Sequence, residues 1–123
     1  MRRKWAHSGP APDLGPIEYR SSWERNIQRL LNHLNIGSRF EPRRFKLAPH
    51  LSYLPDFELD EPNPWNCKWL EIKGRWNFLD QRKLTLFMQL FPQEKLHTIA
   101  SNEYRQLAKQ YKDIISHWET QPQ

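Results

Sequence analysis

Residues 53–76, YLPDFELDEPNPWNCKWLEIKGRW, decide the fold that the sequence predicts. Two short apolar runs flank the segment EPNPWN, whose prolines and asparagines favour a turn or loop. The first run carries Asp56 directly after a proline, and the second carries Glu71 followed two residues later by Lys73. Side chains two apart on a strand point to the same face, so Glu71 and Lys73 share a face. If the two runs form a hairpin, Asp56 can lie opposite them.

These three side chains favour a particular chemistry. Two carboxylates brought close together repel one another, and a cation between them relieves the repulsion. Oxygen ligands from two strands suit Mg²⁺, which keeps water molecules and shares them with phosphate oxygens. A lysine beside such a site can orient or deprotonate the attacking water and offset charge that builds on the phosphate. The plainer alternative is that EIK is a solvated strand end with a surface ion pair.

Helical patterns occur on both sides of this stretch. In residues 19–37 apolar side chains recur at helical spacing, with Ser21 or Ser22 as the N-cap and Gly37 at the end. Glu24 lies at the margin of that apolar stripe and is expected to point toward the interior. Two further helices are predicted, over residues 79–91 with Asp80 as the cap, and over residues 102–118.

Four strands complete the prediction. They cover residues 38–47, bent or bulged at Pro42, then 52–59, 67–74 and 95–101. The predicted fold is therefore α/β, with the order α-β-β-β-α-β-α and a central mixed sheet flanked by helices.

The composition bounds the classes of protein. The chain has 123 residues, enough for one compact domain, and a formal net charge of +5. A positive excess favours a polyanionic partner, and an ordinary basic protein is the alternative. Six Trp, six Phe and four Tyr suit either a small core or stacking on nucleic-acid bases.

The single cysteine and the hydropathy pattern exclude several other classes. Cys67 alone forms neither an internal disulfide nor a thiolate metal cage, which fits a reducing compartment. Apolar runs are too short for a membrane span, and the basic N-terminus lacks the apolar stretch of a secretory signal. We expect a cytoplasmic protein with a flexible, basic, Pro/Gly-rich arm over residues 1–18, one domain over 19–118 and a tail over 119–123.

The motifs and the element order together resemble the PD-(D/E)xK nuclease superfamily, which has a restriction-endonuclease-like core. The motifs are RSSWE with Glu24, YLPDF with Asp56, and EIKGRW with Glu71 and Lys73. The resemblance spans roughly residues 19–104. It is closest to small phage endonucleases of the junction-resolving endonuclease I type, and looser to TnsA-type transposon endonucleases. The long EPNPWN loop and the short proline-rich N-terminus depart from the junction-resolving pattern.

The resemblance implies roles for these residues. Asp56 and Glu71 bind Mg²⁺, for which Mn²⁺ can substitute, Lys73 serves the attacking water, and Glu24 supports this metal or a second one. DNA contacts are expected from residues near the site, each of which also suits a solvated or packing role: Arg20, Arg75, Trp76, Arg82 and Lys83. Some relatives exchange N-terminal elements between subunits, so both a monomer and a homodimer stay open.

The expected function is a Mg²⁺-dependent DNA endonuclease that selects branched DNA such as Holliday junctions, encoded by a phage or mobile element in a bacterial host. Two enzymatic alternatives are a sequence-specific homing or nicking endonuclease and a transposon end-cleaving subunit with a transposition partner. The non-enzymatic alternative is a nuclease fold that binds DNA or a phage-assembly partner without cutting.

Overall fold

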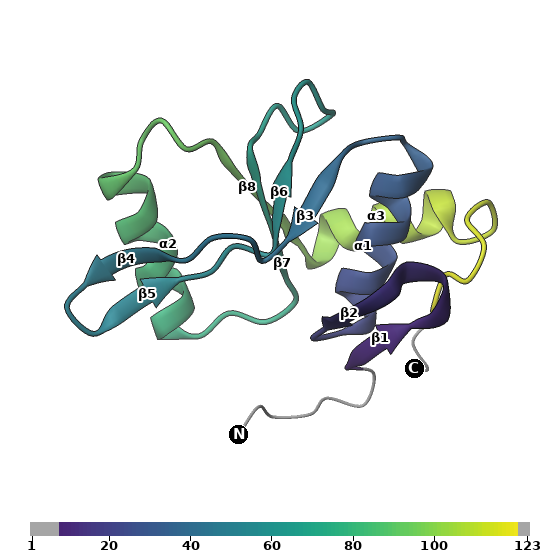
Figure 1. The fold of residues 1–123 in the computed structure, drawn as a ribbon, viewed down its shortest axis with the longest axis horizontal. Helices are drawn as coiled ribbons and strands as arrows, with labels where there is room; N and C mark the ends of the chain where they lie inside the picture. The colour runs from purple at the N-terminus through teal and green to yellow at the C-terminus, as the bar shows by residue number, and fades with distance from the viewer. Residues whose placement is uncertain (1–7, 121–123) are drawn as a thin grey trace. The chain divides into compact units, whose positions relative to one another are not determined.

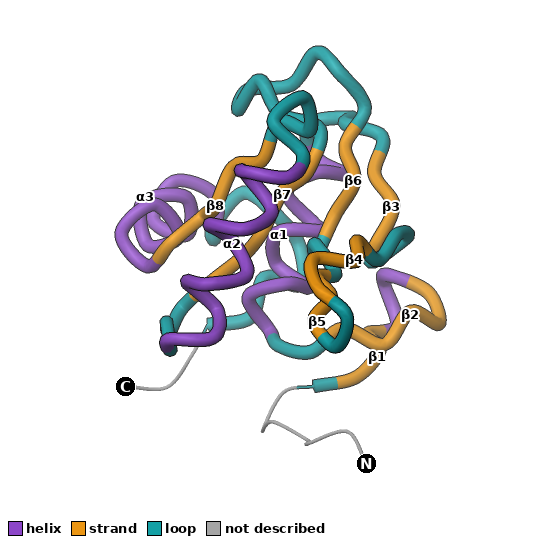
Figure 2. Tube along the Cα trace, turned by 90° about the vertical axis from the view of Figure 1, so that its left-hand side faces the viewer, coloured by secondary structure: helices purple, strands orange, loops and turns teal. Residues whose placement is uncertain are grey.

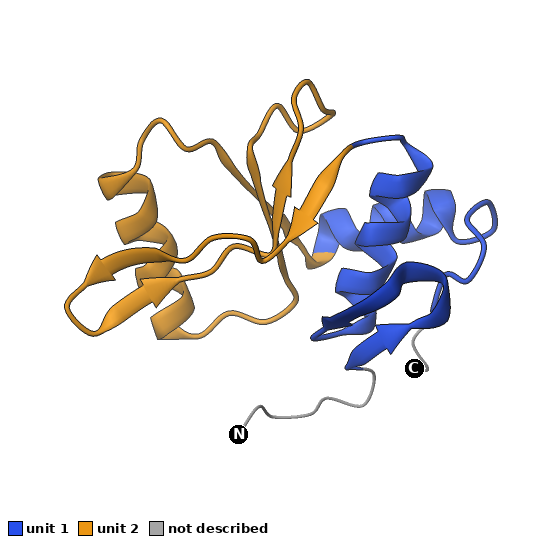
Figure 3. Ribbon diagram, viewed as in Figure 1, with its two compact units in different colours: residues 1–36, 102–123 blue, residues 37–101 orange. Residues whose placement is uncertain are grey.

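The computed structural model describes residues 8–120. The chain separates into two compact units (Figure 3): unit 1 comprises residues 1–36 and 102–123, and unit 2 comprises residues 37–101. The described part is mixed α/β, with three α-helices and a mixed four-stranded sheet, which confirms the predicted class. The single domain over residues 19–118 stays a prediction, as does the tail from residue 119.

Unit 2 holds the four-stranded sheet, in the order β3-β6-β7-β8 (Figures 1 and 2). Its strands are β3 (Ser38–Phe40), β6 (Phe57–Leu59), β7 (Trp69–Lys73) and β8 (Leu96–Ala100). The first three are antiparallel neighbours, whereas β7 and β8 run parallel. A parallel pair needs a long crossover, and helix α2 (Phe78–Leu90) provides it. The predicted hairpin between the strands of Asp56 and Glu71 is confirmed by the β6–β7 pairing.

Two predicted strands are wrong in their extent. Residues 38–47 form β3 and β4 (Phe45–Ala48), and residues 52–59 form β6 and the end of β5 (Leu51–Tyr53). In each case one half joins the four-stranded sheet, and the other half joins the separate β4–β5 hairpin. The chain leaves strand geometry at Glu41, which has φ 49°, and at Pro55. Proline has no N–H for a ladder, so strands break at Pro42 and Pro55.

The core of unit 2 forms between one face of β7, the β4–β5 hairpin and α2. Side chains alternate along β7, so Trp69, Glu71 and Lys73 share this face. Trp69 is buried with four other large side chains, and rings of Phe45 and Phe87 meet edge-to-face at 4.8 Å between centroids. The members of this core are Phe45, Leu47, Tyr53, Trp69 and Phe87. The face is thus apolar at Trp69 and turns polar at Glu71.

Unit 1 contains α1 (Ser22–His33), α3 (Ser101–Tyr111, whose first residue belongs to unit 2) and an N-terminal hairpin. The hairpin consists of β1 (Gly9–Ala11), a 3-10 turn (Pro12–Leu14) and β2 (Gly15–Tyr19). This hairpin occupies most of the segment that was predicted to be a flexible arm; residues 1–7 of that arm lie outside the described residues. Tyr19 is buried and its hydroxyl donates to Gln28 of α1, which ties the hairpin to the helix.

The helix ends differ from the prediction at three places. Ser21 is the N-cap of α1, as one alternative had it, but the helix ends at His33 and Asn35 takes the left-handed conformation expected at Gly37. Asn77, not Asp80, caps α2; Asp80 completes a reciprocal capping box. Helix α3 stops at Tyr111 rather than at residue 118, because the following Asp, Ile and Ser residues are poor helix formers.

Candidate functional site

Asp56 lies at the point where two β ladders end. Its backbone carbonyl accepts a hydrogen bond from Glu41 N–H at 2.8 Å, which continues the β3–β6 pairing by one residue. Its Oδ2 accepts from Ile72 N–H of β7 at 2.7 Å. The β6–β7 register pairs Phe57 with Leu70, so one further step sets Asp56 opposite Glu71. Asp56 is only 3% exposed, and these bonds fix both its backbone and its carboxylate.

Glu71 is the second buried carboxylate, at 7% exposure. Its Oε1 accepts a hydrogen bond of 2.8 Å from the hydroxyl of Tyr53, which comes from β5 in the neighbouring hairpin. Burial raises the pKa of Tyr53 far above its ordinary value, and the charge of Glu71 raises it further. Asp56 and Asp80 act in the same direction. The tyrosine hydroxyl therefore stays protonated and donates to Glu71 throughout the neutral pH range.

Lys73 follows on the same face, with its side chain 25% exposed. Its Nζ lies 3.2 Å from Oδ2 of Asp80 in the first turn of α2. Asp80 also accepts from Asn77 N–H, so the carboxylate that pairs with the lysine belongs to the capping box of the helix. The start of α2 thereby sets where the ammonium group lies, and Asp56, Glu71 and Lys73 come together within unit 2.

Glu24 belongs to unit 1, whereas Asp56, Glu71 and Lys73 belong to unit 2. It is 7% exposed, which confirms the expectation that it points inward. Its Oε1 accepts from Arg20 N–H at 2.8 Å, while Ser21 Oγ accepts from Glu24 N–H. These bonds satisfy donors at the start of α1, and they give Glu24 a structural role as a cap. Its role as a metal ligand stays a prediction.

The residues predicted to contact DNA lie mostly on the surface. Arg20, Arg75 and Arg82 are exposed, Lys83 is half-buried, and Trp76 is 38% exposed. Arg75 and Trp76 follow Lys73 directly in the connection to α2. Their exposure is compatible with the predicted contacts and equally with solvation.

Sequence reasoning missed Tyr53 and Asp80 as partners of the site. Tyr53 stands three residues before Asp56, but it lies on another strand pair, and only the break at Pro55 signals that separation. Asp80 was assigned to the cap alone, because nothing in the sequence indicates its ion pair with Lys73.

Asp56 and Glu71 are the candidate ligands for Mg²⁺ in unit 2. Both side chains offer hard oxygen atoms, and Mg²⁺ is commonly held through one or two carboxylates with water and substrate phosphates. Among residues 8–120, however, no group of three or more His, Cys, Asp and Glu side chains could hold a metal ion. The donor set fits a two-carboxylate site that is completed by water and substrate.

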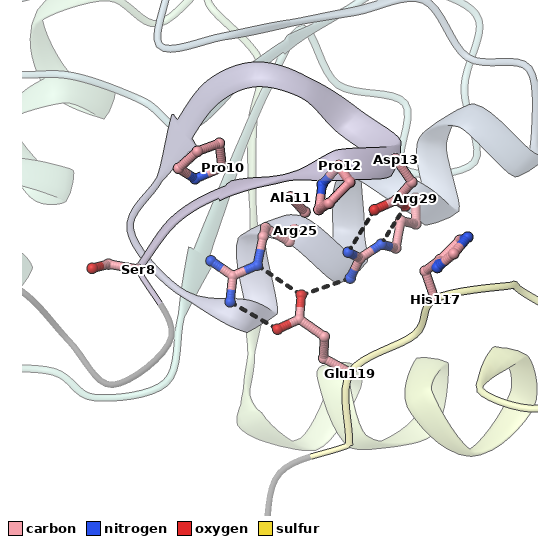
Figure 4. A pocket seen from close by; sticks show the side chains of 9 residues that line it. All are labelled: Ser8, Pro10, Ala11, Pro12, Asp13, Arg25, Arg29, His117 and Glu119. Carbon is pink, nitrogen blue, oxygen red and sulfur yellow. Dashed lines mark hydrogen bonds and ion pairs between the residues drawn. The ribbon is translucent and has the colours of Figure 1, made fainter.

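A second cluster of buried charges occurs in unit 1, beside a cavity of about 330 Å³ (Figure 4). Arg25 and Arg29 of α1 both pair with Glu119 at 2.7 Å, and Arg29 also pairs with Asp13 at 2.8 Å. Each guanidinium forms two parallel bonds to one carboxylate, Arg25 to Glu119 and Arg29 to Asp13. Positive and negative side chains balance, so this cluster holds segments together and offers no surplus charge for a ligand.

No helix within the described residues is long and apolar enough to cross a membrane. Comparison of the chain with protein-family models, with curated proteins and with solved structures finds no match.

Proposed function

We propose that the chain is a Mg²⁺-dependent DNA endonuclease of the PD-(D/E)xK kind that selects branched DNA. The observation that carries the proposal is the pair of buried carboxylates, Asp56 and Glu71, which the strand register sets opposite one another, with Lys73 two residues after Glu71 in β7. Burying a carboxylate is costly unless it is well hydrogen-bonded or binds a cation. Asp56 and Glu71 each accept a hydrogen bond, but two negative charges opposite one another still repel, and a bound cation would relieve this repulsion.

The order of the elements also supports the proposal. Without the two hairpins, the elements follow one another as α1, β3, β6, β7, α2, β8 and α3. This is the order expected for the restriction-endonuclease-like core. Asp56 directly precedes β6, while Glu71 and Lys73 lie within β7. A cytoplasmic location and an origin in a phage or mobile element belong to the same proposal, which leaves both a monomer and a homodimer open.

Each residue has a distinct task in the proposed hydrolysis of a phosphodiester bond. Asp56 and Glu71 would hold Mg²⁺ through their carboxylate oxygens. A bound Mg²⁺ polarises the phosphate and makes a bound water more acidic. Lys73 orients the attacking water and offsets negative charge at the phosphate, from a position that Asp80 sets through the 3.2 Å ion pair. Arg75, Trp76, Arg82 and Lys83 would contact the DNA beside the break.

A cleavage panel tests the proposal. Labelled single-stranded, duplex, flap and four-way-junction DNA are incubated with the protein and Mg²⁺, with and without EDTA. We expect cleavage of the four-way junction above all, its loss with EDTA, and a loss of more than about 100-fold in Asp56→Ala and Glu71→Ala. Cleavage of plain duplex at defined sequences would instead favour a homing, nicking or transposon endonuclease. Binding without cleavage in any metal would leave a DNA-binding or assembly module.

A further inference from the structure

We infer that Tyr53 is a positioning residue for Glu71. The hydroxyl of Tyr53 holds the carboxylate of Glu71 in the orientation that binds the metal. The inference rests on the proposed function, because it assigns Tyr53 to the same site. Tyr53 belongs to the β4–β5 hairpin, so it reaches the site from outside the four-stranded sheet.

The position of Tyr53 is fixed by packing. Its side chain is 5% exposed, and its ring meets the ring of Phe87 edge-to-face with centroids 5.1 Å apart. Phe87 is fully buried in α2, so the tyrosine ring is held between the hairpin and the helix. From this position its hydroxyl donates to Oε1 of Glu71 at 2.8 Å. A rigid donor therefore meets the long side chain of a glutamate.

Asp56 and Glu71 each have one carboxylate oxygen that accepts a hydrogen bond from a buried donor. Ile72 N–H donates to one oxygen of Asp56, and the Tyr53 hydroxyl donates to one oxygen of Glu71. Hydrogen bonds of this kind from outside the ligand set orient metal ligands, and their loss commonly costs about 10–100-fold in metal affinity or activity. The donor on Asp56 is backbone, so Tyr53 is the one of these two donors that a substitution can remove.

A purely structural role for the hydroxyl predicts a different result. In that case the bond satisfies a buried carboxylate, and its loss lowers the free energy of unfolding without a specific effect on metal. Tyr104 provides a matched control, because it is also 5% exposed and its hydroxyl accepts a bond of 2.9 Å from Asn26 in unit 1. Tyr53→Phe and Tyr104→Phe each remove one buried hydroxyl and keep the ring.

The experiment measures Mn²⁺ affinity by titration calorimetry, without DNA, for wild type, Tyr53→Phe, Tyr104→Phe and Glu71→Gln, with circular dichroism to verify folding. We expect the dissociation constant to rise about 10–100-fold in Tyr53→Phe and to stay at the wild-type value in Tyr104→Phe. Junction cleavage by Tyr53→Phe should recover when Mn²⁺ is raised well above the new dissociation constant, because the ligands themselves are intact.

The outcomes separate the inference from the proposed function. If wild type binds Mn²⁺, Glu71→Gln weakens binding and folded Tyr53→Phe binds as wild type does, the inference is overturned and the metal site stands. An equal loss of affinity in Tyr53→Phe and Tyr104→Phe would also overturn it, since stability would then explain both. If wild type binds no Mn²⁺, the proposed function fails and the inference fails with it.

Discussion

At the scale of single residues, Asp56 combines a structural bond with the proposed chemical role. Its carboxylate satisfies Ile72 N–H, so an alanine at this position would leave a buried donor without its bond. Asparagine can still accept that bond, yet it removes one negative charge and one hard metal ligand. Asp56→Asn therefore separates the loss of the metal ligand from damage to the strand end.

We expect Asp56→Asn to lose cleavage while its metal-free affinity for DNA equals or exceeds that of wild type, because a charge that repels the phosphate is gone. Metal-free titration of one labelled junction measures this. Glu58→Gln is the control, because it neutralises a half-buried carboxylate that lies two residues away in β6 and pairs with Arg39. Much weaker DNA binding by folded Asp56→Asn would make Asp56 a recognition or structural residue.

Some residues of the site could be predicted from neighbouring positions in the sequence, and others depend on how distant elements pack. Glu71 and Lys73 could be placed on one face from sequence, because alternation along a strand depends only on neighbouring residues. Asp56 followed once a hairpin was assumed, since the register fixes which residues lie opposite each other. Tyr53 and Asp80 could not be predicted, because their contacts depend on how the hairpin and α2 pack on the sheet.

At the scale of elements, α2 begins with a capping box that also serves Lys73. Asn77 accepts from Asp80 N–H at 2.7 Å, and the Asp80 carboxylate accepts in return from Asn77 N–H. The helix start is thus ordered by the same carboxylate that pairs with the lysine of the site. Any fraying of this turn should loosen Lys73 as well.

We expect Asn77→Ala to lower the free energy of unfolding by about 1 kcal/mol, the usual effect of losing such an N-cap. Urea unfolding measures the change, and cleavage under saturating Mg²⁺ should fall in parallel as Asp80 loses its fixed position. Gln81→Ala changes an exposed residue of the same helix and should leave both quantities near wild type. An unchanged unfolding free energy in Asn77→Ala would show that the box contributes nothing to the helix.

The strands show which elements escape prediction. β7 and β8 were predicted correctly because each is a short run of mainly apolar residues with no proline inside it. The two runs that proved discontinuous contain Pro42 and Pro55. The alternation continues through Pro55, from Tyr53 to Phe57, whereas Phe40 and Phe45 are out of phase around Pro42. From sequence, a proline break does not show whether a strand bends within one sheet or divides between two sheets. Here each run divides, and the β4–β5 hairpin packs against Phe87 of α2.

At the scale of the whole chain, α1 connects the N-terminal hairpin of unit 1 with the segment that follows α3. Asp13 comes from the N-terminal hairpin and Glu119 from the segment after α3, and Arg29 pairs with both. Asn26 adds two bonds to the backbone of Glu119. Such long-range pairing could not be predicted from sequence, where residues 1–18 and 119–123 showed only the composition of an arm and a tail.

This cluster should make the stability of the protein depend on pH. Hydrogen bonds from Arg29 lower the pKa of Asp13 below its ordinary value. Burial raises the pKa of Glu119, but hydrogen bonds from Arg25 and Arg29 outweigh it, so its pKa is also lowered. A carboxylate whose folded pKa is lowered stabilises the fold above its unfolded pKa, and that stabilisation is lost as the pH falls through the folded value.

We therefore expect the free energy of unfolding to fall as the pH is lowered from about 6 to about 3, across the ordinary range of carboxylate titration. Glu119→Gln should be less stable than wild type at pH 6, because two buried guanidinium groups lose their shared anion, and the two proteins should converge toward pH 3. Urea unfolding at a series of pH values measures both curves. Asp113→Asn, which alters an exposed carboxylate of the same unit, is the control and should follow wild type. If the difference between Glu119→Gln and wild type stayed constant over this range, the carboxylate of Glu119 would stabilise unit 1 by packing rather than by its charge.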